Sequence, residues 1–122
     1  MKTILLAEDE EPTLALFQAI VVGHEQWRLL IARTGAEALA MAIRERPDVA
    51  LLGIQIPAPD GFEICRAIKT TPDTGDTYVV MVSAMTQAAS RADAVAAGAD
   101  DFVAKPFSTT ELTELLVNSI GE

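Results

Sequence analysis

The chain has 122 residues, half of them hydrophobic, which is enough for one buried core and too few for two domains. Nine Lys and Arg residues against 18 Asp and Glu residues give a net charge of −9, which argues against nucleic-acid or anionic-membrane binding by this chain alone. The single cysteine, Cys65, excludes an internal disulfide and indicates a reducing, cytoplasmic location, and no apolar run is long enough for a membrane span. We therefore expect residues 1–122 to form a single cytoplasmic domain.

Short apolar runs alternate with segments of helical periodicity along the whole chain. Each run is bounded by polar or turn-forming residues, and its length suits a strand that is buried on both faces. The predicted strands are Thr3–Ala7, Trp27–Ala32, Val49–Leu52, Thr77–Val82 and Asp101–Ala104.

A segment with apolar residues at helical spacing follows each predicted strand. Pro12 suits the first turn of a helix, and Pro47 comes just after the end of another. Ser108 and Glu111 have the spacing of a capping box. The predicted helices are Pro12–Val22, Thr34–Arg46, Phe62–Thr70, Gln87–Ala97 and Ser108–Ile120, and Ile54–Gly61 is predicted to be a loop.

Five strand–helix pairs in strict alternation predict an α/β fold, namely a doubly wound five-stranded parallel sheet with helices on both faces. In such sheets the functional site lies beyond the carboxyl ends of the strands. The residues expected at those ends are Glu8, Asp9, Gly53, Ser83, Ala84 and Lys105.

These strand-end side chains have the chemistry of a site for a phosphoryl group. Glu8 and Asp9 are adjacent carboxylates, and Mg²⁺ prefers a few carboxylate oxygens together with water. Ser83 offers a hydroxyl and Lys105 a positive charge at the same edge of the sheet. Such groups suit an oxyanion held between a metal ion and an ammonium, but they include no evident nucleophile.

The sequence resembles the CheY-like receiver domains of two-component response regulators over nearly its whole length. No single motif decides this, but four motifs occur in order at the predicted strand ends. They are Ile4–Glu10, Pro47–Pro57 with Asp60–Cys65, Val82–Ala84 and Gly98–Phe107. The resemblance implies a flavodoxin-like (βα)5 fold with strand order 2-1-3-4-5.

The resemblance also implies roles for individual residues. In receiver domains an acidic group binds Mg²⁺, and an aspartate at the end of the third strand accepts phosphate from a histidine kinase. The implied metal ligands are Glu8, Asp9 and Gln55. The implied contacts of the phosphoryl group are Ser83, Ala84 and Lys105. Phe102 matches an aromatic residue that changes rotamer on activation, although it can equally be a core residue. The Lys105–Pro106 peptide bond is typically cis in the family.

The partners that the resemblance implies are proteins of phosphorelay signal transduction. They are a sensor histidine kinase or phosphotransfer protein, and an output domain or effector protein. The region of the fourth helix, fifth strand and fifth helix is often a dimer or output contact in receivers. Met1 suggests a true N-terminus, and an output domain could follow the last predicted helix.

Gly53 departs from the family pattern, because it stands where receivers carry the phosphorylated aspartate. Glycine has no side chain to phosphorylate, and its presence removes one Mg²⁺ ligand. The charges of Glu8, Asp9 and Lys105 sum to −1, where an aspartate at position 53 makes −2. We therefore expect weak Mg²⁺ binding, and we expect Lys105 to turn to Asp9 for a partner.

Two other aspartates are poor substitutes for the missing nucleophile. Asp60 lies in the following loop, where it can cap a helix, and Asp48 lies at the opposite end of the third strand. The sequence leaves open whether Gly53 is natural or a laboratory substitution.

Three hypotheses follow for the function. The first is a signalling module, not an enzyme, that cannot accept phosphate at Gly53 and acts through protein–protein interaction. The second is a phospho-accepting receiver whose native residue 53 is aspartate. The third, a small phosphotransferase that uses Asp9, is disfavoured because Glu11 stands where a second aspartate is needed.

Cys65 is interpreted as a core residue, and His24 as a solvated loop residue.

Overall fold

The computed structural model describes residues 1–83, 91–105 and 108–120. Its elements alternate between strand and helix from one end of the chain to the other. The strands are β1 (Lys2–Ala7), β2 (Trp27–Ala32), β3 (Val49–Gly53), β4 (Tyr78–Ser83) and β5 (Asp101–Ala104). The helices are α1 (Glu11–Val22), α2 (Gly35–Glu45), α3 (Gly61–Thr70), α4 (Arg91–Ala96) and α5 (Thr109–Ile120).

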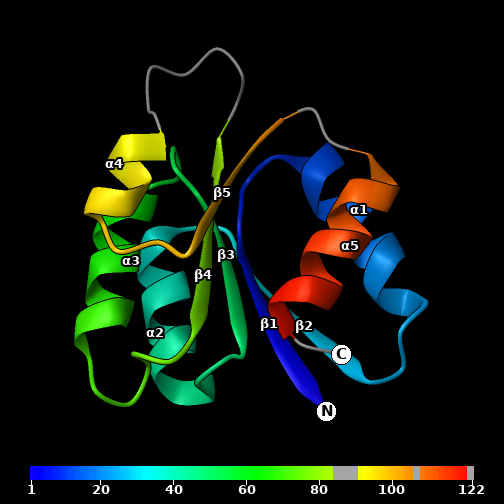
Figure 1. Cartoon of the computed structure of the whole chain (residues 1–122), viewed down its shortest axis with the longest axis horizontal. Coiled ribbons are helices and arrows are strands. Elements are labelled where there is room, and N and C mark those ends of the chain that lie inside the picture. The colour runs from blue at the N-terminus through cyan, green and yellow to red at the C-terminus, as the bar shows by residue number, and fades with distance from the viewer. Residues whose placement is uncertain (84–90, 106–107, 121–122) are drawn as a thin grey trace.

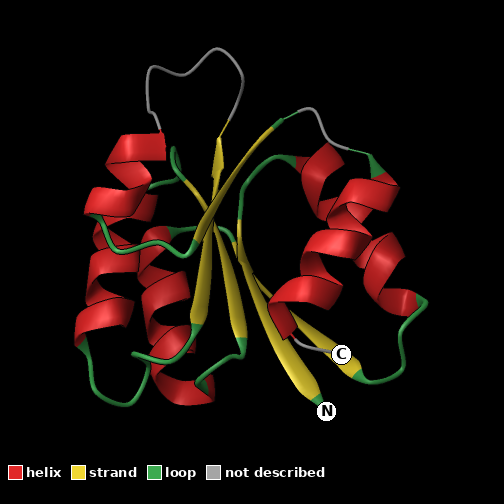
Figure 2. Cartoon of the chain, viewed as in Figure 1, coloured by secondary structure: helices red, strands yellow, loops and turns green. Residues whose placement is uncertain are grey.

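The five strands form one parallel sheet in the order β2-β1-β3-β4-β5, which confirms the predicted fold and strand order. Figure 1 shows the sheet nearly edge-on, with α2, α3 and α4 on one face and α1 and α5 on the other. The same three layers are seen when helices and strands are coloured separately (Figure 2). No helix in the described part of the chain is long and apolar enough to cross a membrane.

Two apolar clusters, one on each face of the sheet, form the core. On the α2–α3–α4 side, residues such as Leu5, Leu52 and Met81 are fully buried, and Cys65 packs among them as expected. On the α1–α5 side the cluster includes Phe17 and Leu116. Because both faces are covered, β3 is buried at every position and β1 is buried from Ile4 to Ala7, which explains their apolar runs.

The predicted element boundaries agree with the structure to within one residue where the ends are described. The predicted capping box is confirmed, because the backbone amide of Ser108 donates to Glu111 and the amide of Glu111 to the Ser108 hydroxyl. Asp60 also caps a helix, as expected, through a reciprocal capping box with Glu63 at the start of α3. The predicted fourth helix began at Gln87, and its first four residues lie outside the described part.

The loop between β3 and α3 is seated against the first turn of α2. The backbone amide of Gly35 donates a 2.7 Å hydrogen bond to the carbonyl of Pro57. A Cβ atom on Gly35 would lie 1.8 Å from the carbonyl oxygen of Pro59, so only glycine permits this approach. The loop that borders the carboxyl end of β3 is thereby fixed to the N-terminus of α2.

His24 was expected to be solvated, but it is half-buried. Its ring stacks on the indole of Trp27, with 3.8 Å between ring centroids and 10° between planes. Trp27 begins β2 at the edge of the sheet, and its side chain is only 4% exposed. This stacked pair covers the end of the α1–α5 core far from the carboxyl ends of the strands.

Candidate functional site

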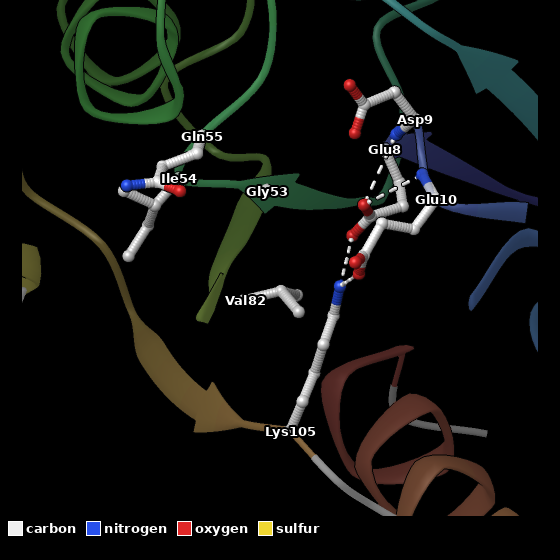
Figure 3. A pocket seen from close by; sticks show the side chains of 8 residues that line it. All are labelled: Glu8, Asp9, Glu10, Gly53, Ile54, Gln55, Val82 and Lys105. Carbon is white, nitrogen blue, oxygen red and sulfur yellow. Dashed lines mark hydrogen bonds and ion pairs between the residues drawn. The ribbon is translucent and has the colours of Figure 1, made fainter. Parts of the chain in front are cut away.

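A small cavity of about 130 Å³ lies at the carboxyl end of the sheet, where the ends of β1, β3, β4 and β5 meet. Charged residues form one side of it, and the loop after β3 forms the other (Figure 3). We call it the strand-end pocket, and its lining residues are Glu8, Asp9, Glu10, Gly53, Ile54, Gln55, Val82 and Lys105.

Glu8 is the most tightly held acid of the pocket. Its amide continues the ladder of the sheet by donating to the carbonyl of Ala32 at 3.0 Å, and the residue is only 4% exposed. Its Oε2 atom accepts hydrogen bonds from the backbone amides of Asp9 and Glu10, both at 3.2 Å. The loop after β1 is therefore wound around the Glu8 carboxylate, which is fixed in the pocket.

Lys105 enters the same pocket from the end of β5. Its backbone amide donates to the carbonyl of Ser83 at 2.7 Å, and its side chain is 20% exposed. The Nζ atom lies 3.1 Å from Oε1 of Glu8 and bonds to the carboxylate of Glu10, as the dashed lines in Figure 3 show. Burial opposes the charged ammonium, but the hydrogen bonds to Glu10 and Glu8 outweigh it, so the pKa of Lys105 is raised.

The expectation that Lys105 turns to Asp9 is therefore wrong. Asp9 lines the pocket but is exposed, and its carboxylate points away from the ammonium (Figure 3). The turn around Glu8 directs the carboxylate of Glu10, and not that of Asp9, toward Lys105. Glu10 is thus a pocket residue that was not predicted from the sequence, although it stands in the acidic run after the first predicted strand.

Gly53 ends β3 beside these charges, and the space that a side chain would fill is narrow. A Cβ atom there would lie 3.1 Å from the carbonyl oxygen of Ala7 and 3.2 Å from a methyl group of Ile56. It would lie 3.4 Å from Oε1 of Glu8, the atom that contacts Lys105. A side chain at position 53 would therefore point into the charged part of the pocket after a shift of a few tenths of an ångström.

The other predicted site residues take different positions. Ser83 is buried at the end of β4, and in the described part of the chain the neighbouring Val82, not Ser83, is the β4 residue that lines the cavity. Gln55 lines the cavity opposite the acids. Phe102 is half-buried, with the Arg91 guanidinium 5.4 Å from its ring centroid. Ala84 and the Lys105–Pro106 peptide bond lie outside the described residues.

The pocket offers the oxygen donors that a hard cation prefers, but too few of them are grouped together. Two carboxylates, Glu8 and Asp9, and the amide of Gln55 are oxygen donors that Mg²⁺ accepts. Among the described residues, however, no three His, Cys, Asp or Glu side chains are grouped closely enough to hold a metal ion. The Lys105 ammonium already contacts an oxygen of Glu8, so a cation would have to compete with it for that atom.

The sequence matches the profile of the response regulator receiver domain over residues 4–117, and the chain belongs to that family. It is 36% identical over 109 residues to the response regulator PleD of Caulobacter vibrioides, which covers 89% of this chain and 24% of PleD. It is 35% identical over 113 residues to the DNA-binding response regulator MtrA of Mycolicibacterium smegmatis, covering 92% of this chain and 48% of MtrA. The chain thus spans half or less of the length of these curated relatives.

Solved structures support the same assignment. The receiver domain of the sensor histidine kinase PA1611 from Pseudomonas aeruginosa superposes with a TM-score of 0.87 at 27% identity, covering 99% of this chain and 98% of that one. That structure is described with a magnesium ion coordinated in the active site cleft. A CheY-like receiver domain from Methanospirillum hungatei has a TM-score of 0.87 at 25% identity, covering 99% of this chain and 94% of that one.

Proposed function

We propose that this receiver domain does not accept phosphate and acts by binding other proteins. The observation that carries the proposal is Gly53 itself, which ends β3 inside the strand-end pocket. An acid, a lysine and a cavity surround the position, but glycine offers no oxygen to carry a phosphoryl group. The domain is then a signalling module and not an enzyme.

The surroundings of the other acids support this proposal. The Asp60 carboxylate accepts the Glu63 amide at 2.9 Å in its capping box, and Asp48 accepts the Thr3 amide at 2.8 Å at the start of β1. Glu11 pairs with Arg33 at 2.9 Å, which weakens the case for a phosphotransferase that uses it together with Asp9. Among the described residues, Asp9 and Glu10 are the exposed acids of the pocket, and Glu10 is paired with Lys105. Asp9 therefore remains to be tested as an acceptor.

The partners we propose are those of the family to which the chain belongs. A sensor histidine kinase or phosphotransfer protein would bind at the pocket end of the sheet. An output domain or effector protein would respond to the state of the domain. The surface of α4, β5 and α5 is proposed as a homodimer or output contact, with Phe102 as a switch residue within it. The proposed location is the cytoplasm, where such partners act.

The proposed cofactor is Mg²⁺, bound weakly. Glu8, Asp9 and Gln55 would hold the ion, which would neutralise negative charge beside position 53. In this chain the Lys105 ammonium and the absence of an acid at position 53 both act against binding.

Intact-mass measurement after incubation with acetyl phosphate and Mg²⁺ tests the proposal. The protein as written is compared with Gly53→Asp and with Gly53→Asn, which has nearly the same size but no acid. We expect a phosphoryl adduct on Gly53→Asp alone, because only that variant combines the pocket with a nucleophile. This outcome also supports the second hypothesis, that the pocket is that of a phospho-accepting receiver lacking only its aspartate.

The other outcomes are equally informative. An adduct on the protein as written overturns the proposal, and Asp9→Asn then shows whether Asp9 carries it. If no variant is labelled, the pocket has lost more than its nucleophile, and the domain is a binding module with no residual phosphoryl chemistry.

A further inference from the structure

The buried carboxylate of Glu8 leaves the ammonium of Lys105 with donors to spare. Oε2 of Glu8 accepts two backbone amides, and Oε1 faces Lys105 at 3.1 Å. An ammonium has three protons to donate, and Lys105 is mostly withdrawn from water, with 20% of its side chain exposed. A second acceptor is therefore required, and Glu10 provides it.

The side chain of Glu10 contacts Lys105 and does not cap helix α1, although Glu10 stands at the N-cap position. It is the N-cap residue of α1, with extended backbone angles of φ −84° and ψ 120°, yet its side chain makes no capping hydrogen bond. The side chain bonds to Lys105 instead, across a sequence separation of 95 residues. One contact thus joins the start of α1 to the end of β5.

The position of Gly53 explains why the lysine is available to Glu10. The Cβ of any side chain at position 53 would lie 3.4 Å from Oε1 of Glu8, the oxygen that Lys105 contacts. A carboxylate built on that Cβ would point toward the region that the ammonium occupies and offer it an acceptor other than Glu10, which is 59% exposed.

We propose that Glu10 is a positioning residue that replaces the missing carboxylate at position 53 as the anchor of Lys105. The resulting clamp ties the loop before α1 to the end of β5 without phosphate or metal. The start of α1 and the end of β5 are then held in one relative arrangement, and a partner binds a surface that does not depend on phosphorylation. This inference rests on the proposed function only in treating position 53 as the phosphoacceptor position.

A double-mutant cycle between Glu10→Gln and Lys105→Met, followed by urea unfolding, tests the clamp. We expect the two changes to be non-additive by about threefold to tenfold in the unfolding equilibrium constant, as for residues in one ion-pair network. The cycle is repeated in the Gly53→Asp background, where the coupling should fall below about twofold because Lys105 then has another anchor. Glu11→Gln is the matched control: Glu11 is the adjacent acid, pairs with Arg33, and should not couple to Lys105.

A spectroscopic measurement keeps the inference testable if Gly53→Asp does not fold. The ¹⁵N-labelled ammonium of Lys105 should give a resolved NMR signal, because a hydrogen-bonded ammonium exchanges slowly with water. The signal should disappear or shift in Glu10→Gln and persist in Glu11→Gln. In Glu10→Asp, which keeps a carboxylate, the change should be smaller than in Glu10→Gln. A fold defect alone would not produce that pattern.

Two results of the mutant cycle would overturn the clamp. One is a cycle that is additive in the protein as written, and the other is a coupling of the same size with aspartate at position 53. An ammonium signal that is indifferent to Glu10→Gln has the same meaning. Labelling by acetyl phosphate would refute the proposed function and leave these results intact, so the two proposals fail separately.

Discussion

Asp100 and Val79 are joined by two hydrogen bonds at the start of β4: the Asp100 amide donates to the Val79 carbonyl at 2.8 Å, and the Val79 amide donates to the Asp100 carboxylate at 2.9 Å. The same carboxylate oxygen lies 2.8 Å from Nζ of Lys69, whose ammonium also donates to the carbonyl of Thr77. Asp100 thus holds the residue that precedes β5 against the start of β4 and the end of α3.

Asp100→Ala should lower the free energy of unfolding by about 2 kcal/mol, because it leaves the Val79 amide and the half-buried Lys69 ammonium without this acceptor. Asp100→Asn should cost less, because an amide oxygen can still accept the Val79 proton. Urea unfolding measures both. Asp73→Ala is the control: its pair with Arg46 is exposed, and its loss should cost less than about 0.5 kcal/mol.

Gly35→Ala should destabilise the protein by about 1–3 kcal/mol, although alanine is normally the better residue in a helix. The reason is the 1.8 Å approach of its Cβ to the backbone of Pro59, which forces the β3–α3 loop away from α2. Gly23→Ala, after α1, is the matched control, since its Cβ would meet nothing nearer than 3.5 Å. Thermal unfolding that ranks the two variants equally would contradict the packing described for this loop.

The Cys65 thiol should be unreactive in the native protein. Burial raises the pKa of Cys65 from 9.0 to about 11, and the Sγ atom donates to the carbonyl of Ala97 at 3.3 Å. The folded state therefore keeps the proton that the unfolded state loses, so the thiol lowers the free energy of unfolding as pH rises from 9.0 through about 11. We expect no reaction with a disulfide reagent at pH 8 until urea unfolds the chain.

The pH dependence is checked by comparison with Cys65→Ala. That variant should be less stable at neutral pH because of the cavity it creates, but it should lose less stability than the parent between pH 9.0 and about 11. Equal slopes for the two proteins would mean that the thiol is not shielded from water.

Lys105→Met should strengthen Mg²⁺ binding at least about fivefold, because it removes a positive charge that contacts Glu8 and competes for its oxygen. Titration calorimetry at low ionic strength measures the dissociation constant. Lys2→Met is the charge-matched control, because Lys2 opens β1 at the amino end of the sheet and should leave the affinity unchanged. If Lys105→Met binds no better than the parent, the ammonium is not what weakens the site.

The fold could be predicted from the sequence because each strand and helix has a local pattern of its own, and these patterns repeat along the chain. Buried runs such as Leu51 and its neighbours required two covered faces, and the cap residues Asp60 and Ser108 marked helix starts that the structure confirms. Predicted strand ends then brought Glu8 and Lys105 to one pocket, because parallel strands end at a common edge.

The details that escaped prediction depend on geometry that is not periodic. Glu10 and Asp9 are neighbours of the same charge, and only the turn around Glu8 decides which one faces Lys105. The contact between Gly35 and Pro59 joins two loops whose approach no spacing in the sequence reveals. Ser83 was expected among the groups of the pocket, yet Val82 lines it, because adjacent strand residues point to opposite faces.

The division of the core by the sheet has a consequence for how such a domain can change. Phe17 and Leu116 pack in one layer and Cys65 and Met81 in the other, with the sheet between them. A substitution that reshapes the outer surface of α1 and α5 for a new partner need not disturb the packing beneath α2, α3 and α4. Each side of the molecule can therefore acquire its own specificity, as two separately adjustable modules would, within a chain of 122 residues.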